Sequence, residues 1–392
     1  MSALLARPSG PRINTLLTTA GTVGSLLSTF ALRLVIARLF GPQPLGLYSA
    51  AVGYQRVTTQ LADLGLHYAL LRRGSGDPAL VRAGISLKML LGLVVALVSI
   101  AVALLVTSGD VTLALVVGSI GVFGWSQLDA AQLWYRLAGR FRLDFLLHTG
   151  TSVARVAAAA VLLLTTGNLA LALAAYFLVP ALASAFIPRP WARPAMRASL
   201  LRDSWWSFVY RTLWLLLLNL DVFLVPAVLG LTALGRYDAP RSVAYALLAL
   251  ADGAFIAILQ RVGAGHDDAL AAAGSIMRFT IIGMLLAPLG GLVAYVALPL
   301  VFGSAFAGAE LAVVFALLVI AYLAASGAST YASALLFERP RWMATLLGAE
   351  IVVGAIVYVA TALASLAAVA AAVAALHLVN LVILRRAVAR TA

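Results

Sequence analysis

The sequence predicts an all-α membrane protein in which twelve transmembrane helices form two lobes of six. Three observations support this prediction. The 392 residues are 63% hydrophobic and 10% charged, whereas about a quarter of the residues in a soluble protein are charged. Apolar runs long enough to cross a bilayer fill nearly the whole chain. A segment of the first half also recurs in the second half, which is typical of a transporter built from two copies of one unit.

The recurring segment follows the first predicted span. The stretch GPQPLGLYSA, from Gly41, recurs about half a chain later as GLTALGRYDA, from Gly230. The gapless alignment of 41–72 with 230–261 has ten identities in 32 positions, and it places Asp63 over Asp252. Six helices return the chain to its starting side, so both copies enter the membrane in the same orientation. We therefore expect the lobes to be related by a pseudo-two-fold axis along the membrane normal.

The apolar runs give the order of the spans. The first run, 14–36, is too long for a cleavable signal and predicts a retained first helix. The longest internal connector is rich in Arg and Pro and predicts a hinge, so we expect an N-terminal lobe over 1–188, a cytoplasmic basic linker over 189–204 and a C-terminal lobe over 205–392. At about 20 residues per crossing, the spans lie near 14–36, 45–70, 83–107, 111–135, 145–165, 169–188, 205–229, 239–260, 276–298, 309–336, 342–362 and 364–384.

Arginine placement predicts the orientation of the chain. With the N-terminus inside, nineteen arginines fall in cytoplasmic segments, and only Arg38, Arg236 and Arg241 fall on the opposite face. The positive-inside rule then makes both termini cytoplasmic. The net charge of +13 thus reflects orientation and contact with anionic lipid, and we expect no nucleic-acid partner.

Several kinds of chemistry are not expected. The chain has no cysteine, which excludes disulfides, thiolate metal sites and cysteine nucleophiles. It has no P-loop motif, so it does not use ATP through such a loop. We expect no catalytic residues, no metal and no cofactor, and therefore no enzymatic activity.

Four arginines lie inside predicted spans, where each costs about 2.5–3.5 kcal/mol unless it is compensated. Arg33 and Arg211 lie near span ends and could reach the interface, whereas Arg56 and Arg155 lie near mid-span. Arg56 and Gln60 also share a helix face with Asp63. Such a polar face must meet another helix or a water-filled cavity. We therefore predict an anion-binding cavity lined by Arg56, Arg155, Arg33, Arg211 and Gln60.

Intramembrane acids leave a second interpretation open. Arginines and acids can pair only to stabilise the fold, and Arg211 with Asp221 or Asp252 is one such combination. Asp63 and Asp252 occupy equivalent repeat positions, which favours a scaffold or gating role. We take as candidates for gating or coupling Asp63, Asp252, Asp221 and Glu350.

Five motifs occur in a characteristic order: RLFGPQPLGLYSAA, LADLGLHYALLRR, YRLAGRFRLDFL, NLDVFLVPAVLGLTALGRYDAPRSV and LVFGSAFAGA. In this order they resemble the polysaccharide-transporter branch of the multidrug/oligosaccharidyl-lipid/polysaccharide (MOP) exporter superfamily, the O-antigen-type flippases. The resemblance implies a V-shaped pair of lobes around a central cavity, in a bacterial inner membrane. It also implies movement of a polyprenyl-diphosphate-linked oligosaccharide to the outer leaflet, with cavity arginines on the diphosphate. The chain departs from the family pattern in having only Arg211 as a basic residue within the second-half spans.

The expected partners are the polyprenyl-diphosphate-linked glycan and membrane lipids, with a polysaccharide polymerase and glycosyltransferases as further candidates, and we expect a monomer. Three alternatives remain. An ion-coupled multidrug antiporter of the same superfamily would use the acids in place of the arginines. A membrane glycosyltransferase or polymerase of lipid-linked sugars would need long external loops, and a scaffold without transport activity would not need Arg56.

Overall fold

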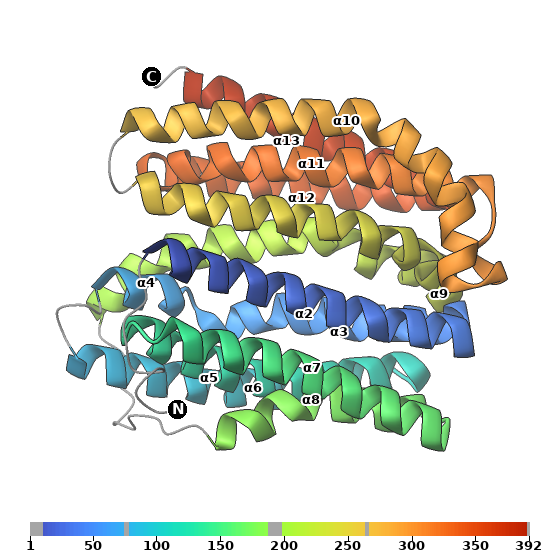
Figure 1. The fold of residues 1–392 in the computed structure, drawn as a ribbon, viewed down its shortest axis with the longest axis horizontal. Coiled ribbons are helices and arrows are strands. Elements are labelled where there is room, and N and C mark those ends of the chain that lie inside the picture. The colour runs from blue at the N-terminus through green and yellow to red at the C-terminus, as the bar shows by residue number, and fades with distance from the viewer. Residues whose placement is uncertain (1–10, 74–77, 187–197, 263–265, 390–392) are drawn as a thin grey trace. The chain divides into compact units, whose positions relative to one another are not determined.

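A computed structural model describes residues 11–73, 78–186, 198–262 and 266–389, without the side chains of 11–19, 71–73, 198–203, 247–276, 333–334, 336–338 and the single positions 22, 68, 78, 106 and 110. Throughout these ranges the regular structure is helical (Figure 1), as the composition predicts. By contacts within the chain, two compact units form: Met1–Leu32 with Ala50–Leu216, and Arg33–Ser49 with Leu217–Ala392. The second unit therefore includes a short segment of the first half. Part of the predicted linker, 189–197, lies outside the described residues.

The first unit is a bundle in which α6 packs against α5 and α8, and α7 packs against α8. The turn between α7 and α8 illustrates how the sequence ends and restarts a helix. Gly167 adopts a left-handed conformation (φ 65°) after α7, and the Asn168 side chain accepts a hydrogen bond from the Leu171 N–H to cap α8 (3.1 Å). The helices of this unit include parts of α2 (Pro11–Phe40) and α3 (Pro42–Asp63), then α4 (Leu66–Arg73), α5 (Pro78–Val106), α6 (Gly109–Leu137), α7 (Phe141–Thr166), α8 (Leu169–Ala185) and the start of α9 (Ala198–Val262).

The second unit is arranged around α11, whose two faces are covered by α10 and α13. The sequence AYLAASGAS in α11 is rich in small residues, which let neighbouring membrane helices approach closely. Besides the rest of α9, the helices here are α10 (His266–Phe302), a 3-10 turn η1 (Ser304–Phe306), α11 (Ala309–Glu338), α12 (Pro340–Ala362) and α13 (Leu366–Ala389).

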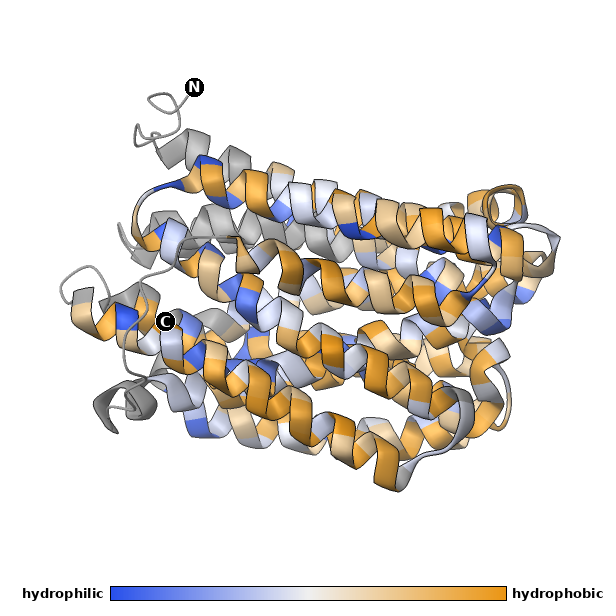
Figure 2. Cartoon of the chain, turned by 90° about the horizontal axis from the view of Figure 1, so that it is seen from below, coloured by the Kyte–Doolittle hydropathy of each residue, from blue (hydrophilic) through white to orange (hydrophobic). Residues whose placement is uncertain are grey.

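The outer faces of several helices are apolar, as a lipid-facing surface requires. Leu97 on α5 and Leu285 on α10, for example, are 58% and 74% exposed, and apolar residues run along most helices (Figure 2). Nine segments of the described residues are long and apolar enough to cross a membrane. One of them, Ser204–Ala246, contains a break at Gly230 (φ 84°) that divides α9 into two helices. The chain is therefore a multi-pass membrane protein, and its division into twelve spans remains a prediction.

The repeated glycine motif forms a reciprocal contact within the second unit. Gly41 and Gly230 adopt the same left-handed φ, 83° and 84°, so the two copies start their helices in the same way. A Cβ atom on Gly46 would meet the carbonyl oxygen of Leu231, and one on Gly235 would meet that of Pro42. The two copies thus pack against each other through their glycines. Two further pairs of aligned residues in the repeat are identical and fully buried: Leu45 with Leu234, and Tyr48 with Tyr237.

We predict that Gly46→Ala and Gly235→Ala each destabilise the protein, because the added methyl group meets backbone that cannot move aside. Overpacking of this kind costs about 1–3 kcal/mol, which lowers the midpoint of thermal unfolding in detergent. The matched control is Gly348→Ala in α12, where an added Cβ meets nothing within 4 Å and alanine favours the helix. Unfolding of Gly46→Ala at the wild-type temperature would contradict the close contact.

Candidate functional site

Buried cations define the interior chemistry of this protein. Among the described side chains four are buried: Arg33 is 7% exposed, Lys88 2%, Arg155 8% and Arg241 2%. A charge in an apolar interior needs a partner, because desolvation costs several kcal/mol. The partners of these four cations differ, and this difference locates the candidate site.

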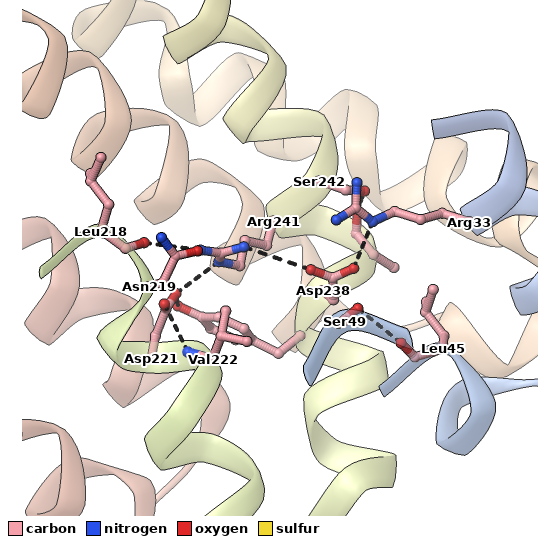
Figure 3. A network of polar contacts seen from close by, with 12 residues as sticks. Arg33, Leu45, Ser49, Leu218, Asn219, Asp221, Val222, Asp238, Arg241 and Ser242 are labelled. Carbon is pink, nitrogen blue, oxygen red and sulfur yellow. Dashed lines mark hydrogen bonds and ion pairs between the residues drawn. The ribbon is translucent and has the colours of Figure 1, made fainter. Parts of the chain in front are cut away.

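In the second unit, two arginines and two aspartates form one network (Figure 3). Arg33 Nε lies 2.9 Å from Asp238 Oδ2, and Arg241 Nε lies 3.0 Å from Asp221 Oδ2. Asp238 also lies between the two arginines, 3.8 Å from Arg241 Nη1. The charges cancel within this network. Further hydrogen bonds come from the Tyr237 hydroxyl to Asp221 (3.0 Å) and from Arg241 Nη2 to the Leu218 carbonyl (2.9 Å) and Asn219 Oδ1 (3.3 Å).

Lys88 forms the equivalent centre of charge in the first unit. Its ammonium group makes ion pairs with Asp63 and Asp129, and His67 Nδ1 lies 3.3 Å from Asp129 Oδ2. Three helices and the short α4 are joined in this way, since these residues come from α3, α5, α6 and α4. The predicted gating residue Asp63 is therefore one arm of a lysine bridge.

Arg155 is different, because no carboxylate of the described residues pairs with it. Its guanidinium carbon lies over two aromatic rings, 4.7 Å from the centroid of Trp125 and 4.6 Å from that of Tyr176. Nη2 donates to the hydroxyl of Thr29 (3.2 Å), and Nε has no hydrogen-bond partner in the described part of the chain. Arg155 is thus a buried cation whose Nε–H group is unsatisfied among the described residues.

Four helices hold Arg155 in place. It lies at the middle of α7, where the neighbouring Ser152 donates to Ser25 Oγ on α2 (2.9 Å). The Thr29 hydroxyl donates to the Ser25 carbonyl (2.8 Å), so its lone pairs remain available to Arg155. Trp125 comes from α6 and Tyr176 from α8. This arrangement can bind an oxyanion, since the guanidinium offers planar donors and an uncompensated charge.

Residues 35–317 match the model of a protein family described as polysaccharide biosynthesis protein. The chain belongs to this family. Its fold is also that of MOP superfamily transporters. The MATE multidrug transporter DinF-BH gives a TM-score of 0.70 at 12% identity over 98% of this chain and 96% of that one.

Two further structures share this fold. The lipid II flippase MurJ in an inward closed conformation gives a TM-score of 0.68 at 11% identity, over 96% and 87% of the two chains. An inward-facing multidrug resistance MATE family transporter gives 0.66 at 14% identity, over 93% and 95%. Among curated proteins, none matches at a significant level. The predicted resemblance is therefore confirmed for the polysaccharide biosynthesis family and for the fold of MOP transporters.

The remaining predicted site residues lie on several different helices. Arg56 and Gln60 lie on α3 and Arg211 on α9, all half-buried. Their roles in binding remain predictions. Glu350 is buried and accepts a hydrogen bond from Asn380 Nδ2 (2.7 Å), and its role in coupling also remains a prediction. The side chain of Asp252 lies outside the described residues.

Sequence reasoning missed two interior cations. It counted Arg241 with the positive charges of the external face, whereas the side chain is buried in the second unit beside Asp221. It also left Lys88 unused, although this residue lies inside the predicted span 83–107. The signal available was the pair Asp63 and Asp129, two intramembrane acids in the second and fourth predicted spans that require a cation, with Lys88 in the span between them.

We predict that Lys88→Met strongly destabilises the protein, because it leaves Asp63 and Asp129 buried without their cation. Removing one member of a buried ion pair costs about 3–5 kcal/mol, which should lower both yield and the melting temperature in detergent. The matched control removes all three charges, as Lys88→Met with Asp63→Asn and Asp129→Asn, and should recover most of the loss. Equal stability of Lys88→Met and wild type would rule out the bridge as a stabilising element.

Proposed function

We propose that this protein is a flippase that moves a polyprenyl-diphosphate-linked oligosaccharide from the cytoplasmic to the outer leaflet, for cell-surface polysaccharide biosynthesis. The observation that carries the proposal is Arg155, which is buried, in contact with no described carboxylate, and unsatisfied at Nε. Family membership supports polysaccharide biosynthesis as the process. The fold shared with MOP transporters supports transport in place of catalysis.

The chemistry of Arg155 suits a diphosphate. A guanidinium offers parallel N–H donors that match two phosphate oxygens, and it stays charged at any working pH. Neutral partners surround it in the protein, so an arriving anion supplies both the missing acceptor and the missing charge. Arg56 and Gln60 on α3, and Arg211 on α9, are further candidates for this role, and Arg33 contributes less because Asp238 already compensates it.

The mechanism we propose is alternating access by rocking of two six-helix lobes, with no covalent chemistry. The protein would lie in a bacterial inner membrane with both termini cytoplasmic. An inside-negative potential favours outward movement of an anion by about 2.3 kcal/mol per charge per 100 mV. For a diphosphate with about two charges, this bias could drive export without a dedicated coupling ion. Glycosyltransferases would supply the lipid-linked glycan, and a polysaccharide polymerase would consume it.

An ion-coupled multidrug antiporter is the second candidate. One observation favours it: Glu350 is buried, and its Oε1 has no hydrogen-bond partner among the described residues. An exporter of organic cations needs a net negative site, however, and the buried acids Asp63, Asp221 and Asp238 are all bound to cations. Arg155, in contrast, is a buried cation with no acid of the described residues beside it, which favours an anionic substrate.

We predict that Arg155→Ala reduces export by about tenfold or more, because a hydrogen bond to a charged group contributes about 1.5–3 kcal/mol. The measurement is accumulation of the surface polysaccharide in a strain that depends on this protein, with its amount in the membrane determined in parallel. The control is Arg386→Ala, which removes an exposed arginine near the end of α13. Normal export by a well-accumulated Arg155→Ala protein would contradict the proposed site.

The substrate class has its own test, in which lipids that co-purify with the protein are identified by mass spectrometry. We expect a polyprenyl diphosphate that carries a glycan, and we expect its amount to fall in Arg155→Ala relative to Arg386→Ala. A small organic cation in its place would favour the antiporter. Because the readout is binding, the test does not depend on how transport is energised.

A further inference from the structure

Two aromatic residues occupy the place where the other buried cations have a carboxylate. We propose that Trp125 and Tyr176 are positioning residues that hold Arg155 against their ring faces, so that its charge and its in-plane donors stay available to the phosphate groups of the ligand. This inference rests on the proposed function. It assigns a role in anion binding to α6 and α8, which carry Trp125 and Tyr176. Neither the placement of charged residues in the sequence nor the internal repeat predicts this role.

A second buried arginine shows the alternative, in which nearby rings accompany an ion pair. Arg241 also lies near two rings, 5.7 Å from the centroid of Tyr245 and 5.9 Å from that of Tyr322. It is bound to Asp221 as well, and its charge is therefore already matched. Arg155 has closer rings, at 4.7 and 4.6 Å, and no described carboxylate. Of these two arginines, only Arg155 retains an unmatched charge for a ligand.

Ring faces can stabilise a cation without cancelling it. The negative face of an aromatic ring attracts a guanidinium electrostatically, and the attraction strengthens when water is excluded. Tyr176 is 2% exposed and Arg155 8%, so this contact is largely dry. A carboxylate in the same position would form an ion pair and compete directly with phosphate oxygens. Rings cannot compete in this way because they are neutral.

The same contacts restrict the direction from which a ligand can bind. Because the ring contacts occupy faces of the guanidinium, a phosphate group would bind along its edge, where the N–H groups point. Nη2 is directed to Thr29, which acts as a neutral acceptor because its own proton goes to the Ser25 carbonyl. Nε is left without a partner among the described residues. A phosphate oxygen at Nε would supply the acceptor that this buried donor lacks, which favours binding of the oxyanion edge of a diphosphate here.

The first test installs the missing carboxylate. Thr29→Asp places an acid next to Arg155 Nη2, and Thr29→Asn places a neutral amide of the same shape there. Binding of farnesyl diphosphate to the purified protein is measured, with farnesol as the control for detergent partitioning, alongside thermal stability. We expect Thr29→Asp to bind about tenfold more weakly than Thr29→Asn while being equally or more stable. A purely structural Arg155 would gain stability from the acid without losing affinity.

The second test removes the rings. Trp125→Leu and Tyr176→Leu should each weaken binding of farnesyl diphosphate by about three- to tenfold, and Trp125→Phe and Tyr176→Phe should restore most of it because the ring face remains. If both leucine variants bind as tightly as wild type while Arg155→Ala and Thr29→Asp lose binding, the aromatic positioning is wrong and the proposed function stands. If Arg155→Ala and Thr29→Asp also bind normally, the anion site itself is wrong. Should a leucine variant fail to fold, the comparison of Thr29→Asp with Thr29→Asn still decides whether Arg155 must remain unpaired.

Discussion

The need to compensate buried charge organises both units of this protein. An unpaired ion costs several kcal/mol in an apolar interior, so each interior cation fixes the helices that supply its partners. Lys88 joins α3, α5 and α6 through Asp63 and Asp129, and Asp238 joins α2 to α9 through Arg33. Since these bonds tie distant parts of the chain together, they determine which helices can be neighbours. Arg155 departs from this rule, because aromatic rings take the place of a carboxylate among the described residues.

Reciprocal packing of the repeat supplies the second constraint. Gly46 and Gly235 each leave room for the backbone of the other copy, and this contact places 33–49 with the second unit. Two arginines of the same segment reinforce the placement. Arg33 binds Asp238, and Arg38 donates to the carbonyls of Val301 (2.7 Å) and Leu300 at the end of α10, where free carbonyl groups attract a cation. The repeat therefore marks a packing contact and not only an evolutionary duplication.

Local patterns account for what the sequence predicted, and non-local contacts account for what it missed. Apolar runs predict helices because a membrane span must form hydrogen bonds between its own backbone N–H and C=O groups. The shared glycines were visible in the repeat. Arg33 and Arg155 looked alike, however, since both are arginines within apolar spans. One meets Asp238, far away in the sequence, and the other meets two rings. Helical spacing shows which residues share a face, but it does not show what that face contacts.

The distribution of charge gives the two units different capacities. In the second unit, Arg33 and Arg241 are matched by Asp238 and Asp221, so this network has no net charge to offer a ligand. In the first unit, Lys88 is bound by two acids, Asp63 and Asp129, and Arg155 alone remains unmatched among the described buried cations. The repeat shows the same loss of charge in its second copy, where Tyr245 and Ala249 are aligned with Arg56 and Gln60. Tyr245 packs against Tyr322 (5.4 Å between ring centroids), a contact that suits a structural interior. Among the described residues, the unmatched buried cation therefore lies in the first unit, and the two units differ in this respect although they share the repeated segment.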